Sequence, residues 1–316
     1  MSSILDPVTG ALTVAGYRVG WQAVRRLPAP VAYGIFQAMA DAAVLRGGKG
    51  VRRLRSNYAK VRPELDDKAL DDLVRDGMRS YMRYFCEAFR LPDMSSTQLA
   101  DAVVATGHEA ARTHLDQGRG VTCFIGHMGN FDLGGAWSTT HLWPVTTIAE
   151  RLEPEEVFQD FLRFRTELGM TIVPLTGGPK PFDAMREALH HGAFVPLPAD
   201  RDLTANGVEV DLCGHRARVA KGPAALAVAT GAALFTAAVW YEDAPPGRGV
   251  GGKVVRVEFS EQIEPRADLD GDAAVRELTQ RCVDFLGARI TQHTSAWHML
   301  QRVFVDDLDP ARRRTP

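Results

Sequence analysis

The chain has 316 residues, a formal net charge of −2 and a hydrophobic content of 45%. This composition excludes a protein that is disordered over most of its length, and the chain can bury one large core or two small ones. The four cysteines are scattered without C-x-x-C spacing, which argues against a zinc site or a disulfide framework and fits a reducing compartment. The first residues lack the basic and apolar regions of a signal peptide, so we expect the protein to stay on the cytoplasmic side.

The basic residues are concentrated at the start of the chain. Residues 1–62 carry ten Lys or Arg against two Asp, a net charge of +8, so the rest of the chain carries −10. Apolar stretches at 11–24 and 31–45, separated by Pro28 and Pro30, predict two helices that meet at an angle. Neither stretch has the ~20 uninterrupted apolar residues of a membrane span. The stretches fit helices that lie in the headgroup region of an anionic membrane, and the alternative is a helical pair packed on the core.

The remainder of the chain predicts one long helix and then an alternation of strands and helices. The long helix covers 66–89, and we assign its aromatic side chains to the core. The alternation predicts an α/β fold with a central, largely parallel sheet covered by helices on both faces. The expected strands are 103–106, 121–125, 145–149, 171–174, 194–197, 234–240 and 254–259, and the expected helices are 108–117, 131–139, 154–168, 180–190 and 273–290.

Two segments depart from this alternation. Residues 208–219 predict a β-hairpin with Gly214 in its turn. Residues 222–240 contain no charge and have the length of a membrane span. Pro223 and the pair Thr230-Gly231 mark the start and end of a shorter helix, so we expect a buried helix followed by a buried strand.

A histidine follows the strand 121–125 directly after Gly126. His127 therefore lies at the carboxyl edge of a strand, where α/β sheets bind ligands. Asn130 can cap the next helix, which places Asp132 in its first turn. The H-x4-D spacing then lets a carboxylate reach one imidazole nitrogen while the other faces a substrate, as a general base requires. The alternative is a His and an Asp that only satisfy the hydrogen bonds of a loop.

Charged residues also follow two other expected strands. If these strands are parallel neighbours of the strand before His127, their carboxyl ends share one crevice with it. Each residue alone is more often a solvated loop residue, and only their coincidence favours a site. The residues are Glu150 after 145–149, and Asp200, Arg201 and Asp202 after 194–197.

Several sequence blocks occur in the order of a known family. The chain resembles the bacterial lysophospholipid and lipid A acyltransferase superfamily over about residues 100–305. The segment Glu150-Arg-Leu followed by Leu168-Gly-Met is most similar to the phosphatidylinositol mannoside acyltransferases of that superfamily. The blocks are His127–Asp132, Ala149–Leu152 with Arg163–Met170, Ala199–Leu203, Gly222–Ala227 with Thr230–Ala232, and, more loosely, Trp297–Phe304.

The resemblance implies a single acyltransferase domain over 1–316, with basic amphipathic membrane-binding helices in 1–62 and an α/β catalytic core in 100–305. It implies transfer of a long acyl group from acyl-CoA, with palmitoyl-CoA as the expected donor, to a mannose hydroxyl of phosphatidylinositol mannoside. The expected location is the cytoplasmic face of the inner membrane, as a peripheral protein on an anionic surface. We expect no bound cofactor, no metal and no nucleic-acid partner.

The resemblance also implies roles for the candidate residues. His127 deprotonates the acceptor hydroxyl, and either Asp132 or Glu150 is the main partner of its ring; a thioester donor needs no nucleophilic serine or cysteine. Arg165 and Arg201 are candidates for anionic groups of the donor or acceptor, and Asp200 or Asp202 for sugar hydroxyls.

Two further expectations concern the reacting groups. Backbone amides of Met128 to Asn130 are expected to stabilise the oxyanion, and the small residues Gly134, Gly135 and Ala136 leave room for an acyl chain. Two alternatives to the proposed reaction stay open. One is a lipid A or lysophospholipid/glycerol-phosphate acyltransferase, and the other is a non-catalytic lipid-binding protein on the membrane.

Overall fold

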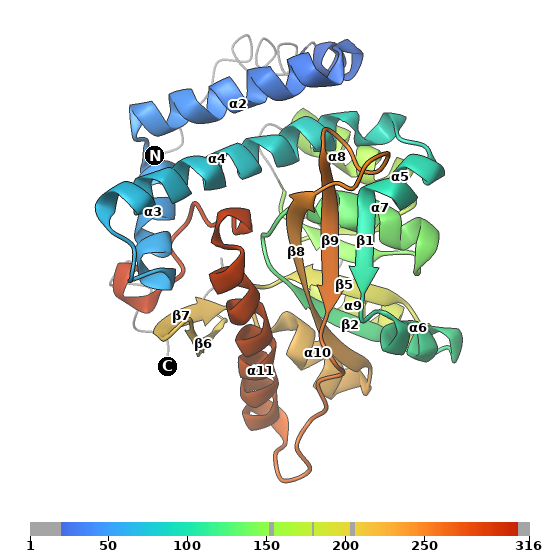
Figure 1. Ribbon diagram of the computed structural model, residues 1–316. Coiled ribbons are helices and arrows are strands. Elements are labelled where there is room, and N and C mark those ends of the chain that lie inside the picture. Colours follow the sequence, from blue (N-terminus) through green and yellow to red (C-terminus); the bar gives the residue numbers. More distant parts are fainter. Residues whose placement is uncertain (1–19, 152–154, 179, 203–205, 309–316) are drawn as a thin grey trace.

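The computed structural model describes residues 20–151, 155–178, 180–202 and 206–308. At its centre is a five-stranded sheet with the strand order β1-β9-β8-β2-β5 (Figure 1). Three of its four pairings are parallel, and only β8 and β9 are antiparallel. Helices flank the sheet, so the predicted α/β class is confirmed. The strands are β1 (Val103–Thr106), β2 (Val121–Ile125), β5 (Phe194–Pro198), β8 (Ala233–Asp243) and β9 (Lys253–Phe259).

Two smaller sheets lie beside the central one. β3 (Thr146–Ala149) and β4 (Thr171–Pro174) form a parallel pair. The side chain of Thr147 on β3 donates to the carbonyl of Pro196 on β5 at 2.6 Å, so the carboxyl ends of β3 and β5 lie close together. The expected hairpin is present as β6 (Val208–Leu212) and β7 (His215–Val219), joined at two residues with positive φ, as a tight turn of this type requires.

The two faces of the central sheet are covered by different helices, and the alternation along β8 shows which side chains face each group. Leu234 and Ala238 pack into a core with residues of α3, α4, α10 and α11. Phe235 and Ala237 pack into a second core with residues of α5, α6, α7 and α8. The helices are α2 (Ala29–Arg46), α3 (Lys49–Val61), α4 (Asp67–Arg90), α5 (Ser96–Ala102), α6 (Glu109–Asp116), α7 (Phe131–His141), α8 (Glu155–Glu167), α9 (Pro181–His190), α10 (Gly222–Thr230) and α11 (Gly271–Gln292).

The uncharged run 222–240 forms α10 and most of β8, as predicted. Within the described ranges, no helix is long and apolar enough to cross a bilayer. The expected helix 11–24 falls mainly on residues that the structure does not describe, and 20–26 are helical. The sequence reading missed α3, although its buried residues Leu54, Tyr58 and Val61 recur at helical spacing.

The helix α2 lies along α4 at one edge of the molecule (Figure 1). Ala32, Phe36 and Ala40 form its buried side, and Asp41 accepts two hydrogen bonds from Arg79 of α4 at 2.8 and 2.9 Å. The packed face of α2 is therefore fixed against the body of the protein. Its other face exposes a row of apolar residues at helical spacing, Val31, Ile35 and Met39, each about half exposed.

Two glycines in helices give opposite predictions for stability. A Cβ at Gly77 of α4 would lie 2.4 Å from the hydroxyl oxygen of Tyr58, a fully buried residue of α3, whereas a Cβ at Gly34 of α2 meets nothing within 4 Å. We expect Gly77→Ala to lower the free energy of unfolding by about 1–3 kcal/mol through overpacking. Gly34→Ala should raise it by up to about 1 kcal/mol, because alanine loses less entropy in a helix. Urea unfolding measures both, and changes of the same sign would contradict this packing of α3 on α4.

Candidate active site

A groove with a volume of about 340 Å³ lies at the carboxyl ends of β2, β3 and β5. Its walls come from α4, α7, α8 and the segment 298–301, and most of the surface that it presents is apolar. Five of the charged or ionisable candidates from the sequence line it. They are His127, Asp132, Glu150, Arg165 and Arg201.

The imidazole of His127 is held by a buried aspartate. Its Nδ1 lies 2.5 Å from Oδ1 of Asp200, and its backbone amide donates to Oδ2 of the same carboxylate at 2.9 Å. The indole Nε1 of Trp297 donates to Oδ2 at 2.9 Å. Because an ionised carboxylate only accepts hydrogen bonds, Nδ1 carries a proton, and Nε2 of the neutral ring is left as an acceptor for the groove.

The strand register explains why these two residues meet. In the parallel pairing of β2 and β5, Ile125 is opposite Pro198, and the amide of Ala199 donates to the carbonyl of Ile125 at 2.9 Å. His127 and Asp200 each follow two residues after this pair, so the sheet places them side by side. A Cβ on Gly126 would lie 3.3 Å from the Asp200 carboxylate, which favours glycine between strand and histidine.

The environment keeps Asp200 ionised. The residue is 1% exposed, and such burial opposes its charge. The neighbouring His127 and the hydrogen bonds from His127 and Trp297 outweigh this penalty and hold the pKa of Asp200 below its usual value. A buried carboxylate that remains charged can stabilise the imidazolium that forms when His127 takes up a proton.

The prediction that Asp132 or Glu150 would be the main partner of His127 is wrong, because Asp200 occupies that position. Asp132 lies in the first turn of α7 and faces α4 and α8. Its two oxygens accept from Arg165 at 2.9 and 3.1 Å, and Oδ2 also accepts from the hydroxyl of Tyr84 at 2.7 Å. The aspartate of the H-x4-D motif therefore connects α7 to α4 and α8 in the wall of the groove.

Glu150 lines the groove directly after β3. It is exposed, and its carboxylate is 3.5 Å from Nη2 of Arg201. Arg165 is hydrogen-bonded to Asp132. Burial opposes the charge of Arg165, but the neighbouring Asp132 keeps the pKa of Arg165 above its usual value. The assignment of Asp200 to sugar hydroxyls is corrected by its pairing with His127. Asp202 accepts from the backbone amide of Gly207 at 3.0 Å and does not line the described groove.

Sequence reasoning also missed the contribution of the segment 296–298. The amide of Gly129 donates to the carbonyl of Ala296 at 2.9 Å, so it is not available to an oxyanion as expected. The amide of His298 donates to the carbonyl of His127 at 2.8 Å. The Trp297 block was recognised only as a family resemblance, because no local pattern shows that this segment pairs with residues 127 and 129.

A second imidazole, that of His298, lines the same groove. Its Nε2 lies 2.9 Å from the hydroxyl of Ser80 on α4. Burial of the ring, together with the nearby His127, lowers the pKa of His298 to about 3. His298 is therefore neutral at physiological pH. In the described ranges, no cluster of His, Cys, Asp or Glu could hold a metal ion.

Comparison with known proteins assigns this site to a family. The model of the bacterial lipid A biosynthesis acyltransferases matches residues 8–305. The chain belongs to this acyltransferase family. A phosphatidylinositol mannoside acyltransferase of Mycolicibacterium smegmatis is 39% identical to it over 309 residues, which cover 97% of this chain and 96% of that protein. A protein of the same name from Mycobacterium tuberculosis is 38% identical over 311 residues, 97% of this chain and 93% of the relative.

The family membership confirms the resemblance drawn from the ordered blocks. The protein is an acyltransferase, so the alternative of a non-catalytic lipid-binding protein is not supported. The acyltransferase blocks that contain His127 and Asp200 are those that the structure brings together at the ends of β2 and β5.

The pKa of His298 makes the stability of this acyltransferase depend on pH. The unfolded chain gains a proton on this side chain near pH 6.5, but the folded protein gains it only near pH 3. Between these two pH values the unfolded state holds one more proton than the folded state. The free energy of unfolding therefore falls by about 1.4 kcal/mol for each unit by which the pH is lowered. We expect His298→Gln to remove this slope between pH 4.5 and 6.5 in urea unfolding, whereas the exposed control His190→Gln keeps it. An unchanged slope in His298→Gln would contradict the buried, neutral state of the ring.

Proposed function

We propose that this acyltransferase moves a long-chain acyl group from acyl-CoA to a mannose hydroxyl of phosphatidylinositol mannoside. The acceptor is inferred from relatives of that name, which match nearly the full length of this chain. The observation that carries the mechanism is the His127–Asp200 pair on the wall of a largely apolar groove. The pair supplies a base, and the groove supplies room for a lipid.

In the proposed reaction His127 acts as a general base. Its Nε2 takes the proton of the acceptor hydroxyl, whose pKa is far too high for ionisation at neutral pH, and the oxygen attacks the carbonyl carbon of the thioester. A carbon–oxygen bond forms, the carbon–sulfur bond breaks, and the leaving thiolate takes the proton from the imidazolium. Asp200 stabilises the imidazolium and keeps the ring in the tautomer that has Nε2 unprotonated.

The remaining charged residues of the groove are proposed to bind substrate rather than to move protons. Arg201 is the guanidinium available for anionic groups of the donor or acceptor, and Glu150 orients it across 3.5 Å. Asp132, Arg165 and Tyr84 form a hydrogen-bonded wall that keeps α4, α7 and α8 in place around the substrates. The catalytic contribution of Asp132 is thus proposed to be indirect.

The acyl tail is proposed to enter the sheet side of the groove. A small apolar cavity of about 50 Å³ lies between α7 and the central sheet, and Ile125, Phe131 and Gly135 line both this cavity and the groove. Gly134 and Gly135 line this cavity, which supports the expectation that small residues of this helix leave room for a chain. The hydroxyl oxygen of Ser138, which also lines the cavity, is buried and has no hydrogen-bond partner among the described residues.

The protein is proposed to bind the cytoplasmic face of the cell membrane as a peripheral protein through residues 1–62. The outward row of Val31, Ile35 and Met39 on α2 can dip into the headgroup region, while the basic residues of α3 are attracted to anionic lipids. The helix α2 packs along α4, which forms part of the wall of the groove, so this arrangement would hold the groove close to lipid substrates.

The proposed acceptor is tested by offering the purified enzyme acyl-CoA and one acceptor at a time. We expect mass spectrometry to show one added acyl group on phosphatidylinositol mannoside, and little product with lysophospholipid, glycerol phosphate or a lipid A precursor. Fragmentation should place the new ester on a mannose. Preferred acylation of one of the other acceptors would overturn the proposed substrate and leave the enzyme class intact.

The proposed route of the acyl tail is tested at Ser138. Ser138→Leu adds apolar volume and removes the unpaired hydroxyl, so we expect a folded enzyme that prefers shorter acyl-CoA donors. The expected change is a loss of about tenfold or more in kcat/KM for a 16-carbon relative to a 10-carbon donor. Ser138→Ala removes the same hydroxyl without filling the space and should keep the wild-type preference. Equal preferences in the two variants would exclude this cavity as the chain site.

The proposed membrane surface is tested with a double variant. Ile35→Glu combined with Met39→Glu places two charges in the exposed row of α2 without touching its packed face. We expect binding to vesicles that contain anionic phospholipid to weaken by about tenfold or more in co-sedimentation. Phe182→Glu changes another exposed apolar side chain, on α9, and should bind as the wild type does. Wild-type binding by the double variant would assign membrane contact to a different surface.

A further inference from the structure

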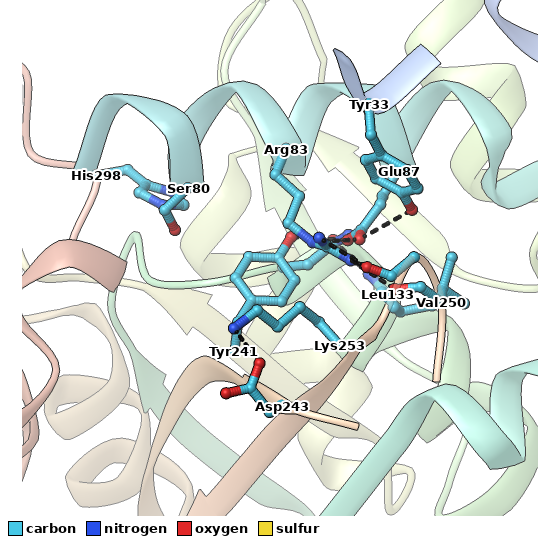
Figure 2. A network of polar contacts seen from close by, with 12 residues as sticks. Tyr33, Ser80, Arg83, Glu87, Leu133, Tyr241, Asp243, Val250, Lys253 and His298 are labelled. Atoms are coloured by element: carbon cyan, nitrogen blue, oxygen red, sulfur yellow. Dashed lines mark hydrogen bonds and ion pairs between the residues drawn. The ribbon is translucent and has the colours of Figure 1, made fainter. Parts of the chain in front are cut away.

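The helix α4 carries a buried carboxylate that the proposed mechanism does not use. Glu87 is 4% exposed, and each of its oxygens has two polar partners. Oε1 is paired with Nε of Arg83 at 2.8 Å and accepts from the hydroxyl of Tyr33 at 3.2 Å. Oε2 accepts from the hydroxyl of Tyr241 at 2.7 Å and from the side-chain amide of Asn130 at 2.9 Å. Figure 2 shows Tyr33, Arg83 and Tyr241 gathered around Glu87.

The contact with Asn130 connects Glu87 to the active-site segment. Asn130 is fully buried, and its side-chain oxygen accepts from the amide of Leu133 as the N-cap of α7. This cap fixes the orientation of the amide group, so the nitrogen must point to Glu87. Along the chain, this capping residue comes only three positions after the histidine of the site.

The segment from Gly126 to Asn130 is held at three places. The amide of His127 is bound by Asp200, and residues 127 and 129 exchange backbone hydrogen bonds with residues 298 and 296. The third place is the contact between Asn130 and Glu87. The first two lie on the sheet side and on the segment 296–298, so Glu87 ties residues 126–130 to α4, next to the contact that Tyr84 of the same helix makes with Asp132.

Burying a carboxylate costs desolvation free energy, and an apolar side chain of similar volume often stabilises a core equally well. A purely structural contact therefore does not require a carboxylate. Here the carboxylate accepts hydrogen bonds from α2, β8 and the active-site segment, and it forms an ion pair within α4. An anionic group with three hydrogen-bond donors and one ion-pair partner fixes the direction of the Asn130 amide more strictly than apolar packing can.

We propose that Glu87 is a positioning residue for acyl transfer, acting through Asn130 on the segment that carries His127. This inference rests on the proposed function, in which Nε2 of His127 must lie close to the acceptor hydroxyl. A displacement of about 1 Å in such a group can cost a factor of about 10² in rate. Glu87 does not line the groove, so its loss should lower kcat much more than it raises KM.

The test exchanges the donor and the acceptor of the Asn130–Glu87 hydrogen bond. In Glu87→Gln only one acceptor oxygen remains, and the charged Arg83 next to Oε1 attracts it, so the new amide nitrogen faces the amide nitrogen of Asn130. Asn130→Asp places two carboxylates opposite each other. We expect each variant to lower kcat by about tenfold or more, with KM for acyl-CoA within about threefold. In the double variant the amide introduced at position 87 can donate to the carboxylate introduced at position 130, which still caps α7. We expect its kcat to recover to within about fivefold of the wild type.

A control separates positioning from general stabilisation. Tyr241→Phe removes another hydrogen bond to the same oxygen of Glu87 without changing Asn130, so it should lower the melting temperature and leave kcat within about threefold of the wild type. All assays are done well below the melting temperature of each variant. Losses in kcat that multiply in the double variant, or a Glu87→Gln enzyme with wild-type kcat, would overturn the inference.

Crystal structures of the wild type, Glu87→Gln and the double variant test this inference independently of the proposed function. If the wild type acylates no glycolipid, the proposed function fails. The positioning role is then decided by whether residues 126–132 move in Glu87→Gln and return in the double variant. An unmoved segment in Glu87→Gln would overturn the role of Glu87, whatever the acceptor is.

Discussion

The interaction on which the active site depends is the buried contact of Asp200 with His127 and Trp297. A carboxylate with 1% exposure is stable as an anion only when strong donors surround it. Here the donors come from the loop after β2 and from a segment near the end of the described chain. Asp200 thereby fixes the tautomer of His127 and joins three segments that are far apart in the sequence. In the proposed mechanism, this pair supplies the reactive group on the wall of the apolar groove.

The architecture around the pair follows from the sheet. The carboxyl ends of β2, β3 and β5 face the same groove, and α4 crosses above it with three polar anchors on successive turns. Ser80 contacts His298, Tyr84 contacts Asp132, and Glu87 contacts Asn130. These spacings of four and three residues place all three side chains on one face of the helix. The helix α2 packs on the same α4, so the proposed membrane surface and the groove share one rigid element.

Much of the fold could be predicted from the sequence, because short β-branched strands alternate with helices and polar residues cluster at strand ends. The groove was also predictable in outline, since His127, Glu150 and the Asp200 group were expected at one edge. The partner of His127 could not be predicted from the sequence. The spacing H-x4-D made Asp132 the obvious choice, but the start of α7 directs that carboxylate to Arg165 and Tyr84. The correct choice depends on the register of β2 with β5, which no local pattern specifies.

The most direct test of the account is a double-mutant cycle on the two central residues. The values of kcat for acyl transfer are measured for His127→Ala, Asp200→Asn and the double variant. If Asp200 acts only through the imidazole, the double variant should be no slower than His127→Ala, as is found for residues that act as a unit. Losses of the two single variants that multiply in the double variant would show independent roles and would contradict the central claim.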